Sequence, residues 1–269
     1  MFTNPLFEKY NLKPNKIPQK FTKYFTIISA FAENKLEGKR LLDVGCGLGI
    51  LLAHAKSLGL KPTGIDIFTE YGKNCYTMAT EILKHYGISE DESKKILQHS
   101  DVTNLDESFF NKYDFAISIG MLEHISGRKV RDKVVSNIFK SLKSGGYMLL
   151  VCGPNKYFPV DLHHYGPKFI FYHTFPDSIK KYYLKFFGKP EFGTDPTWLN
   201  GIRVNEIKKA IKGVDKNAEI MQAFPLLFQI DLKRKWMRNS VVNKLIVMFS
   251  KLLTLMKTEP VIFIIARHS

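Results

Sequence analysis

A short run of the chain combines one acid with three closely spaced glycines, a pattern that suits a nucleotide-like ligand. Asp43 precedes Gly45, Gly47 and Gly49 in the order Asp-x-Gly-x-Gly-x-Gly. Glycine lets the backbone approach a ligand where a Cβ atom would intrude, and it adopts the dihedral angles that a tight turn needs. An acid ahead of the turn suits a ligand that carries an amino group. The spacing differs from the Gly-x-Gly-x-x-Gly turn of dinucleotide-binding proteins.

A second acid follows at an interval that suits a ribose. Asp66 lies 23 residues after Asp43, at the end of the next apolar run and just before Ile67. A carboxylate in this position accepts hydrogen bonds from a ribose diol and disfavours a 2′-phosphate. Two other interpretations remain: a structural turn with acids that cap helices, and an oxidoreductase that binds a dinucleotide.

These residues need a framework that brings the ends of several strands together. Short apolar runs at 40–44, 61–67, 95–102, 113–119 and 146–152 predict five strands, and the residues at 50–58, 69–86 and 128–142 between them predict helices. Strands that alternate with helices of this length pair in parallel, so the pattern predicts a doubly wound α/β sheet with ligands at the carboxyl ends of the strands. Beyond residue 153 we expect a helix at 203–211 and two more strands at 219–224 and 261–266.

With these motifs in order, residues 38–153 resemble the class I, Rossmann-like S-adenosylmethionine-dependent methyltransferases, and in particular the broad type-11 methyltransferase-domain group. The turn after Asp43 matches the first motif of that class, and two further matches are the fourth-strand segment 113–125 and the turn at 142–147. The resemblance implies S-adenosyl-L-methionine as the cofactor. It assigns cofactor binding to Asp43, Gly45, Gly47, Gly49, Asp66, Ile67, Asp101, Val102 and Gly120.

The resemblance also predicts the organisation and activity of the chain. We expect an N-terminal covering segment at 1–37, a cofactor-binding core at 38–153, and an acceptor or lid region at 154–269 that includes the last two strands of a seven-stranded sheet. The expected reaction is O-methylation of a small-molecule, glycan or lipid-linked acceptor. An RNA methyltransferase and a noncatalytic protein that binds RNA or membrane through its basic surface remain as alternatives.

An oxygen acceptor requires a base, because the hydroxyl proton must leave. His124 follows the fourth predicted strand and Asp161 and His163 follow the fifth, so these three are the candidate catalytic residues. For His124 the alternative is a lining residue of the cofactor pocket. For Asp161 and His163, with the adjacent His164, the alternatives are loop structure and a metal site. We expect no resident metal.

The net charge of +15 is unevenly distributed. Residues 1–39 carry +4, residues 40–160 carry +2 and residues 161–269 carry +9. The last part holds a basic run at 233–238 and an apolar helix predicted at 240–256, which contains too few residues and too many lysines to span a bilayer. Peripheral membrane contact through 232–257 is one interpretation, and a lid or dimer helix is the other.

Three widely spaced cysteines, Cys46, Cys75 and Cys152, suit neither a disulfide framework nor a zinc site. The first residues contain no apolar stretch that would act as a signal peptide. We therefore expect a cytoplasmic protein, with membrane association left open.

Overall fold

The computed structural model describes residues 19–33, 35–68, 75–158, 174–187, 200–226, 240–257 and 260–269. Its strands form one seven-stranded sheet in the order β3-β2-β1-β4-β5-β7-β6. The bounds are β1 Arg40–Val44, β2 Lys61–Asp66, β3 Leu97–His99, β4 Tyr113–Ile119, β5 Leu142–Cys152, β6 Glu219–Gln222 and β7 Ile262–Arg267. β1 pairs in parallel with β2 and β4, β2 pairs in parallel with β3, and β6 and β7 pair antiparallel. The predicted doubly wound, mostly parallel sheet is confirmed.

The chain divides into two compact units, Met1–Ile117 with Ser141–Tyr147, and Ser118–Lys140 with Met148–Ser269. Within the first unit, α3 packs on β1 and β2, and both α2 and α4 contact α3. Leu52, Ile82 and Leu83 are fully buried in this packing, as the apolar face of each helix requires. The helices of this unit are α2 Gln19–Phe31, α3 Ile50–Ser57, α4 Cys75–His85 and α5 Glu90–Ile96.

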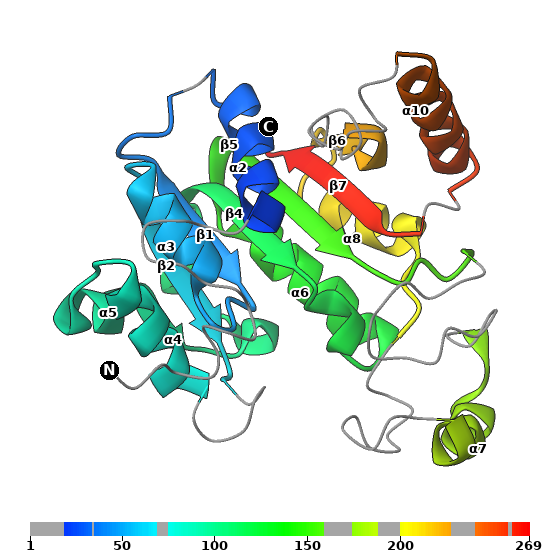
Figure 1. Cartoon of the computed structure of the whole chain (residues 1–269), viewed down its shortest axis with the longest axis horizontal. Helices are drawn as coiled ribbons and strands as arrows, with labels where there is room; N and C mark the ends of the chain where they lie inside the picture. The colour runs from blue at the N-terminus through cyan, green and yellow to red at the C-terminus, as the bar shows by residue number, and fades with distance from the viewer. Residues whose placement is uncertain are drawn as a thin grey trace. The chain divides into compact units, whose positions relative to one another are not determined.

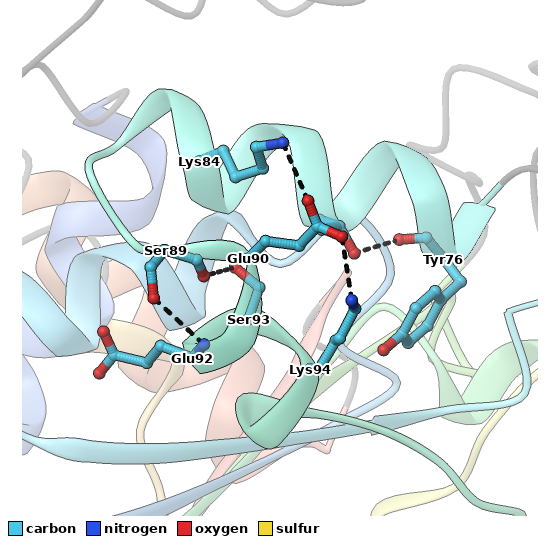
Figure 2. Close-up of polar contacts among 8 residues, drawn as sticks. Tyr76, Lys84, Ser89, Glu90, Glu92, Ser93 and Lys94 are labelled. Atoms are coloured by element: carbon cyan, nitrogen blue, oxygen red, sulfur yellow. Dashed lines mark hydrogen bonds and ion pairs between the residues drawn. The ribbon is translucent and has the colours of Figure 1, made fainter.

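Helix α5 corrects one strand boundary. Ser89 is its N-cap and accepts a hydrogen bond from the Glu92 backbone N–H at 3.2 Å. The helix continues to Ile96, which the sequence had placed in the third strand. β3 is therefore shorter than the predicted strand at 95–102. Figure 2 shows this corner, where the Glu90 carboxylate also lies between the ammonium groups of Lys84 and Lys94, at 3.3 and 3.0 Å.

In the second unit, α6 and α8 lie side by side (Figure 1). The helices of this unit are α6 Arg128–Lys140, α7 Asp177–Phe187, α8 Val204–Val214 and α10 Ser240–Leu255. Three strand predictions differ at their ends. β5 begins at Leu142 rather than at residue 146, β6 ends at Gln222 rather than at residue 224, and β7 spans Ile262–Arg267 rather than 261–266. The domain boundaries at 37 and 153 stay a prediction.

All three cysteines are buried, and Cys152 lies in β5 as a buried strand residue. In the described ranges, no helix combines the length and the apolar character needed to cross a membrane.

Candidate functional site

The glycine turn leaves β1 at Val44 and leads into α3. Gly45, Gly47 and Gly49 have φ angles of 74°, 47° and 71°, which a residue with a Cβ atom rarely adopts. A Cβ atom built on Gly47 has no heavy atom within 4 Å. The backbone at this point therefore borders open space, and a ligand can approach it closely.

Asp66 holds the turn against the end of β2. Its Oδ2 accepts a hydrogen bond from the Gly47 backbone N–H at 2.9 Å, and its Oδ1 accepts one from the Phe68 N–H at 2.6 Å. Each carboxylate oxygen has a second lone pair. Asp66 is only partly buried, so these lone pairs remain for the hydroxyls of a ribose. The side chain thus has a structural contact that the sequence did not predict, beside the expected ribose contact.

Asp43 is a buried acid with an unused oxygen. The residue is 1% exposed, and its Oδ2 makes no hydrogen bond within the described part of the chain. Burial and the nearby negative charge of Asp66 raise the pKa of Asp43 to about 8. A buried carboxyl beside a second acid is stabilised in its charged form by a cation. The ammonium group of S-adenosylmethionine is such a cation, so the residues present fit this cofactor.

The residues predicted to contact the adenine, Asp101 and Val102, follow the strand that pairs with the end of β2. β3 pairs Asp66 with His99, and the Ser100 N–H donates to the Asp66 carbonyl oxygen at 3.1 Å. Asp101 then caps a short 3-10 helix, Val102–Asn104, by accepting from the Thr103 N–H at 2.8 Å. Ile67 is 47% exposed and Val102 is buried. The first unit therefore brings together the glycine turn, Asp43, Asp66, Ile67, Asp101 and Val102.

Two residues of this region were missed in the sequence. Phe68 has a φ of +50° and is buried, and its ring lies edge-on to Tyr76, with the two centroids 5.1 Å apart. Gly64 in β2 faces Leu52 of α3, and a Cβ atom there would lie 2.4 Å from Leu52 Cδ1 and 2.8 Å from Cys46 Sγ. An aromatic residue two positions after the ribose acid was a usable signal for Phe68, whereas the contact of Gly64 depends on packing between distant segments.

The remaining predicted residues belong to the second unit or lie outside the described ranges. Gly120 has a φ of 72° and donates its N–H to the Val151 carbonyl oxygen at 2.9 Å. His124 ends a 3-10 helix, Leu122–His124, and is partly buried. Its catalytic role stays a prediction. Asp161 and His163 lie outside the described residues, as does the adjacent His164.

The loop after β4 is held by a contact that no sequence pattern indicated. Both the backbone N–H and the side-chain amide of Asn200 donate to the Glu123 carbonyl oxygen, at 2.9 and 3.0 Å. Glu123 itself is buried. This segment thus joins the loops at the carboxyl ends of β4 and β5 from a position 77 residues away.

One cavity of about 290 Å³ lies elsewhere, at the amino ends of β4 and β5. Lys39, Asp114 and Lys143 line it together with Phe31 and Tyr147. Because Asp114 already accepts from Lys143 at 3.2 Å and from the Arg40 backbone N–H at 2.8 Å, its carboxylate is used within the protein. In open α/β sheets ligands bind at the carboxyl ends, so we do not assign the cofactor to this cavity.

Comparison with curated proteins finds relatives that all match a limited part of the chain. A ubiquinone biosynthesis O-methyltransferase of Nitrosococcus oceani is 36% identical over 111 residues, which is 41% of this chain and 42% of that protein. A sphingolipid C9-methyltransferase of Komagataella phaffii is 32% identical over 118 residues, 42% of this chain and 23% of that protein. The chain thus matches less than half the length of these relatives.

Solved structures extend the similarity of fold over nearly the whole chain. A putative sarcosine dimethylglycine methyltransferase from Galdieria sulphuraria superposes with a TM-score of 0.54 at 11% identity, covering 98% of this chain and 97% of the other. The phosphoethanolamine N-methyltransferase 2 of Haemonchus contortus, solved with S-adenosylhomocysteine, gives 0.53 at 19% identity over 92% of this chain and 52% of the other.

The methyltransferase-domain family matches residues 18–173, more than half of the chain, and this range contains the glycine turn, Asp43 and Asp66. The matched structures belong to a class whose cofactor is S-adenosylmethionine. The glycine turn, Asp43 and Asp66 provide a fitting site for this cofactor. The chain belongs to the methyltransferase-domain family, among the class I S-adenosylmethionine-dependent methyltransferases.

Proposed function

We propose that this chain transfers a methyl group from S-adenosylmethionine to an oxygen of a small-molecule, glycan or lipid-linked acceptor. The observation that carries the proposal is the buried carboxyl of Asp43 beside the open side of the glycine turn. Asp43 holds the ammonium group and Asp66 holds the ribose hydroxyls. The cofactor supplies the electrophilic methyl group.

The residues of the chain contribute to the reaction mainly by positioning the cofactor and the acceptor. Holding two reactants in line contributes roughly 7–11 kcal/mol in well-aligned cases. An oxygen acceptor must also lose its proton, and we assign this step to His124 or to the pair Asp161 and His163. The aromatic residues and the cations in the sequence after residue 153 support a glycan or lipid-linked acceptor, because aromatic faces and cations bind both.

Calorimetric titration with S-adenosylmethionine and S-adenosylhomocysteine tests the cofactor part. We expect Asp66→Ala to weaken binding at least tenfold, because both ribose hydroxyls lose their acceptor. Asp91→Ala removes the same charge from an exposed position on α5 and serves as the matched control. Absence of binding of either ligand by the wild type would refute the proposal.

The acceptor is identified by incubating the protein with methyl-labelled cofactor and fractionated cell extract. Label in lipid, glycan or small molecules supports the proposal, and label in RNA supports the RNA methyltransferase alternative. With an acceptor in hand, His163→Ala and Asp161→Ala should lower kcat more than cofactor affinity. Unchanged kcat in both would remove this pair from the mechanism.

We further propose that α10 contacts an anionic lipid surface. Its exposed residues are unusually apolar, with Leu245, Met248, Phe249, Leu252 and Leu255 between 50% and 80% exposed. The polar Ser250 is instead 2% exposed and donates to the Val247 carbonyl oxygen at 2.8 Å.

Two exposed lysines, Lys244 and Lys251, accompany this apolar surface, and residues 240–257 contain no acid. An apolar face with flanking cations is typical of helices that lie in the interface of anionic membranes. The basic run at 233–238 lies outside the described residues. Within α10, Ser250 faces the protein, whereas Lys244 and Lys251 face solvent.

Vesicle flotation tests this contact. We expect binding to vesicles of phosphatidylcholine with one quarter phosphatidylglycerol, and much weaker binding to phosphatidylcholine alone. Phe249→Ser with Leu252→Ser should abolish binding, and Val130→Ser, at an exposed apolar position on α6, should not. A concentration-dependent dimer that the double variant abolishes, without vesicle binding by the wild type, would show that a second copy covers the helix instead.

A further inference from the structure

Three arginines of the second unit surround one buried acid. Glu206 of α8 is 8% exposed. Its Oε2 lies 3.6 Å from Arg131 Nη2, and its Oε1 lies 3.9 Å from both Arg203 Nε and Arg128 Nε. Arg128 and Arg131 come from α6, and Arg203 is the residue before α8.

The contacts of this cluster are longer than those of a structural ion pair. Arginine and carboxylate pair through hydrogen bonds of about 2.7–2.9 Å when the geometry is good, and each of the three distances exceeds 3.5 Å. The buried Nε atoms of Arg131 and Arg203 make no hydrogen bond in the described part of the chain. A buried donor without a partner is unfavourable, because it has lost its hydrogen bond to water.

The charges of the cluster are also unbalanced. Within the described ranges, three guanidinium groups face Glu206, and the other acid that pairs with them is Asp132, 3.8 Å from Arg128 Nε. Among these described residues one positive charge remains without a paired acid. An oxyanion would supply both the missing charge and acceptors for the guanidinium donors.

The cluster lies at the carboxyl ends of β4 and β5. Arg131 Nη1 donates to the Ile125 carbonyl oxygen at 3.0 Å, directly after the 3-10 helix that follows β4. Ile202 donates its N–H to the Pro154 carbonyl oxygen at 3.0 Å and accepts from the Lys156 N–H at 2.7 Å, which holds Arg203 beside the loop after β5. Open α/β sheets bind their ligands at this edge.

The outer part of the cluster is accessible. The side chains of Arg128 and Arg203 are 52% and 38% exposed. The Arg203 guanidinium carbon lies 5.8 Å from the centroid of the Tyr157 ring, and Tyr157 is itself 53% exposed. A ligand can thus reach two guanidinium groups and an aromatic face from solvent.

From these contacts we propose that Arg128, Arg131 and Arg203 bind a phosphate group of the methyl acceptor, with Glu206 keeping the guanidinium groups in place while the acceptor is absent. The inference rests on the proposed function, since it names the class of acceptor. Glu206 competes with the phosphate for the same donors. Removing its charge therefore strengthens phosphate binding, whereas removing an arginine weakens it.

The test is calorimetric titration of the full chain with inorganic phosphate, in the presence of saturating S-adenosylhomocysteine and at constant ionic strength. We expect Arg203→Gln and Arg128→Gln to weaken phosphate binding at least fivefold, and Glu206→Gln to strengthen it severalfold. Lys209→Gln, which removes an exposed charge from the same helix α8, should bind like the wild type.

Thermal melts of each variant check that it folds, and Arg203→Gln keeps the test decisive if Glu206→Gln does not fold. A wild type that binds S-adenosylhomocysteine but not phosphate overturns this inference and leaves the proposed function intact. Equal phosphate binding by Arg203→Gln and Lys209→Gln also overturns it. A repeat with glycerol 3-phosphate and with vesicles that contain phosphatidic acid distinguishes a soluble acceptor from a lipid.

Discussion

The two acids of the cofactor site differ in their hydrogen bonds. Asp66 accepts two of them from backbone N–H groups, those of Gly47 and Phe68. Asp43 is buried, and its Oδ2 has no hydrogen bond in the described part of the chain, so burial and Asp66 raise its pKa to about 8. In the free protein at neutral pH Asp43 is therefore largely protonated, and it must release that proton to bind an ammonium group.

This linkage predicts that cofactor affinity depends on pH. Between pH 6 and about 8 the affinity for S-adenosylmethionine should rise by up to tenfold per pH unit. The reason is that the fraction of Asp43 carrying the proton that binding must release falls over this range. The rise ends above the pKa of Asp43. Titration in buffers of different ionisation enthalpy measures the released proton directly. Equal affinity at pH 6 and pH 8 without proton release would contradict the prediction.

The raised pKa also predicts an effect on stability. Since the folded-state pKa of Asp43 lies above its unfolded value, ionisation of this acid does not affect stability at pH 3 and increasingly destabilises the fold as pH rises toward 8. Asp43→Asn should therefore raise the free energy of unfolding of the free protein at pH 8 by roughly 2 kcal/mol or more, and change it little near pH 4. Urea denaturation at both pH values measures this difference. Cofactor binding by the variant should be lost, and a variant that binds normally would show that Asp43 does not hold the ammonium group.

At the scale of elements, close packing of α3 on β2 keeps the glycine turn in place. Gly64 allows Leu52 and Cys46 to approach the strand where any Cβ atom would overlap them. Leu52 and Cys46 both belong to the buried cluster behind the site. The position of the turn thus depends on one small residue in the neighbouring strand.

Gly64→Ala should lower the free energy of unfolding by roughly 1–3 kcal/mol, since the added methyl group overpacks the core. The comparison is Gly213→Ala near the end of α8, where a Cβ atom meets nothing within 4 Å. That change should be neutral or stabilising by about 0.5–1 kcal/mol, because alanine is the better helix former. Chemical denaturation of both variants measures whether their changes in the free energy of unfolding have opposite signs. Equal stability of the two variants would refute the packing argument.

Ser89 determines where α5 begins, as Figure 2 shows. Ser89→Ala should destabilise the protein by about 1 kcal/mol through the loss of the N-cap hydrogen bond to the Glu92 N–H. Ser89→Asp, which keeps a hydrogen-bond acceptor at this position, should retain most of the stability that Ser89→Ala loses. Lys94→Ala removes only an exposed ion pair with Glu90 and should leave the melting temperature unchanged. A larger effect of Lys94→Ala than of Ser89→Ala would contradict the assignment.

For the whole molecule, charge is separated along the chain. Residues 40–160, which contain the described cofactor residues, carry +2, whereas residues 161–269 carry +9. Exposed charges are screened by salt, and buried contacts are screened much less. Cofactor binding and lipid binding should therefore respond differently to ionic strength.

Raising the salt concentration from 0.05 to about 0.5 M should reduce vesicle binding strongly, as the Debye length falls from over 10 Å toward 4 Å. Affinity for S-adenosylhomocysteine should change less than twofold over the same range. Flotation measures the vesicle binding and calorimetry measures the affinity for S-adenosylhomocysteine, both on the same sample. Vesicle binding that is insensitive to salt would show that the apolar face of α10 acts without its lysines.

The sequence alone predicted the seven strands in their chain order, several of the helices between them and the residues of the glycine turn, but not α5 or α7. These features follow from local rules: apolar runs indicate buried parallel strands, and positive φ angles favour glycine. Asp43 and Asp66 could be singled out because each stands at or near the end of a predicted strand. The roles of Asp101 and Val102 came from the resemblance to the methyltransferase class, and all four cofactor contacts stay predictions. The third strand was predicted too long at both ends, since neither helix α5, which ends at Ile96, nor the 3-10 helix that Asp101 caps was recognised.

Only the tertiary structure decided which side of α10 faces solvent, which atoms brace Asp66, and which residues gather around Glu206. A periodic pattern defines the faces of a helix, but neighbouring elements determine which face they cover. Ser250 is buried and Phe249 is exposed for this reason. Arg131 and Glu206 are 75 positions apart in the sequence, and no local rule relates residues so distant; the packing of α6 on α8 brings them together.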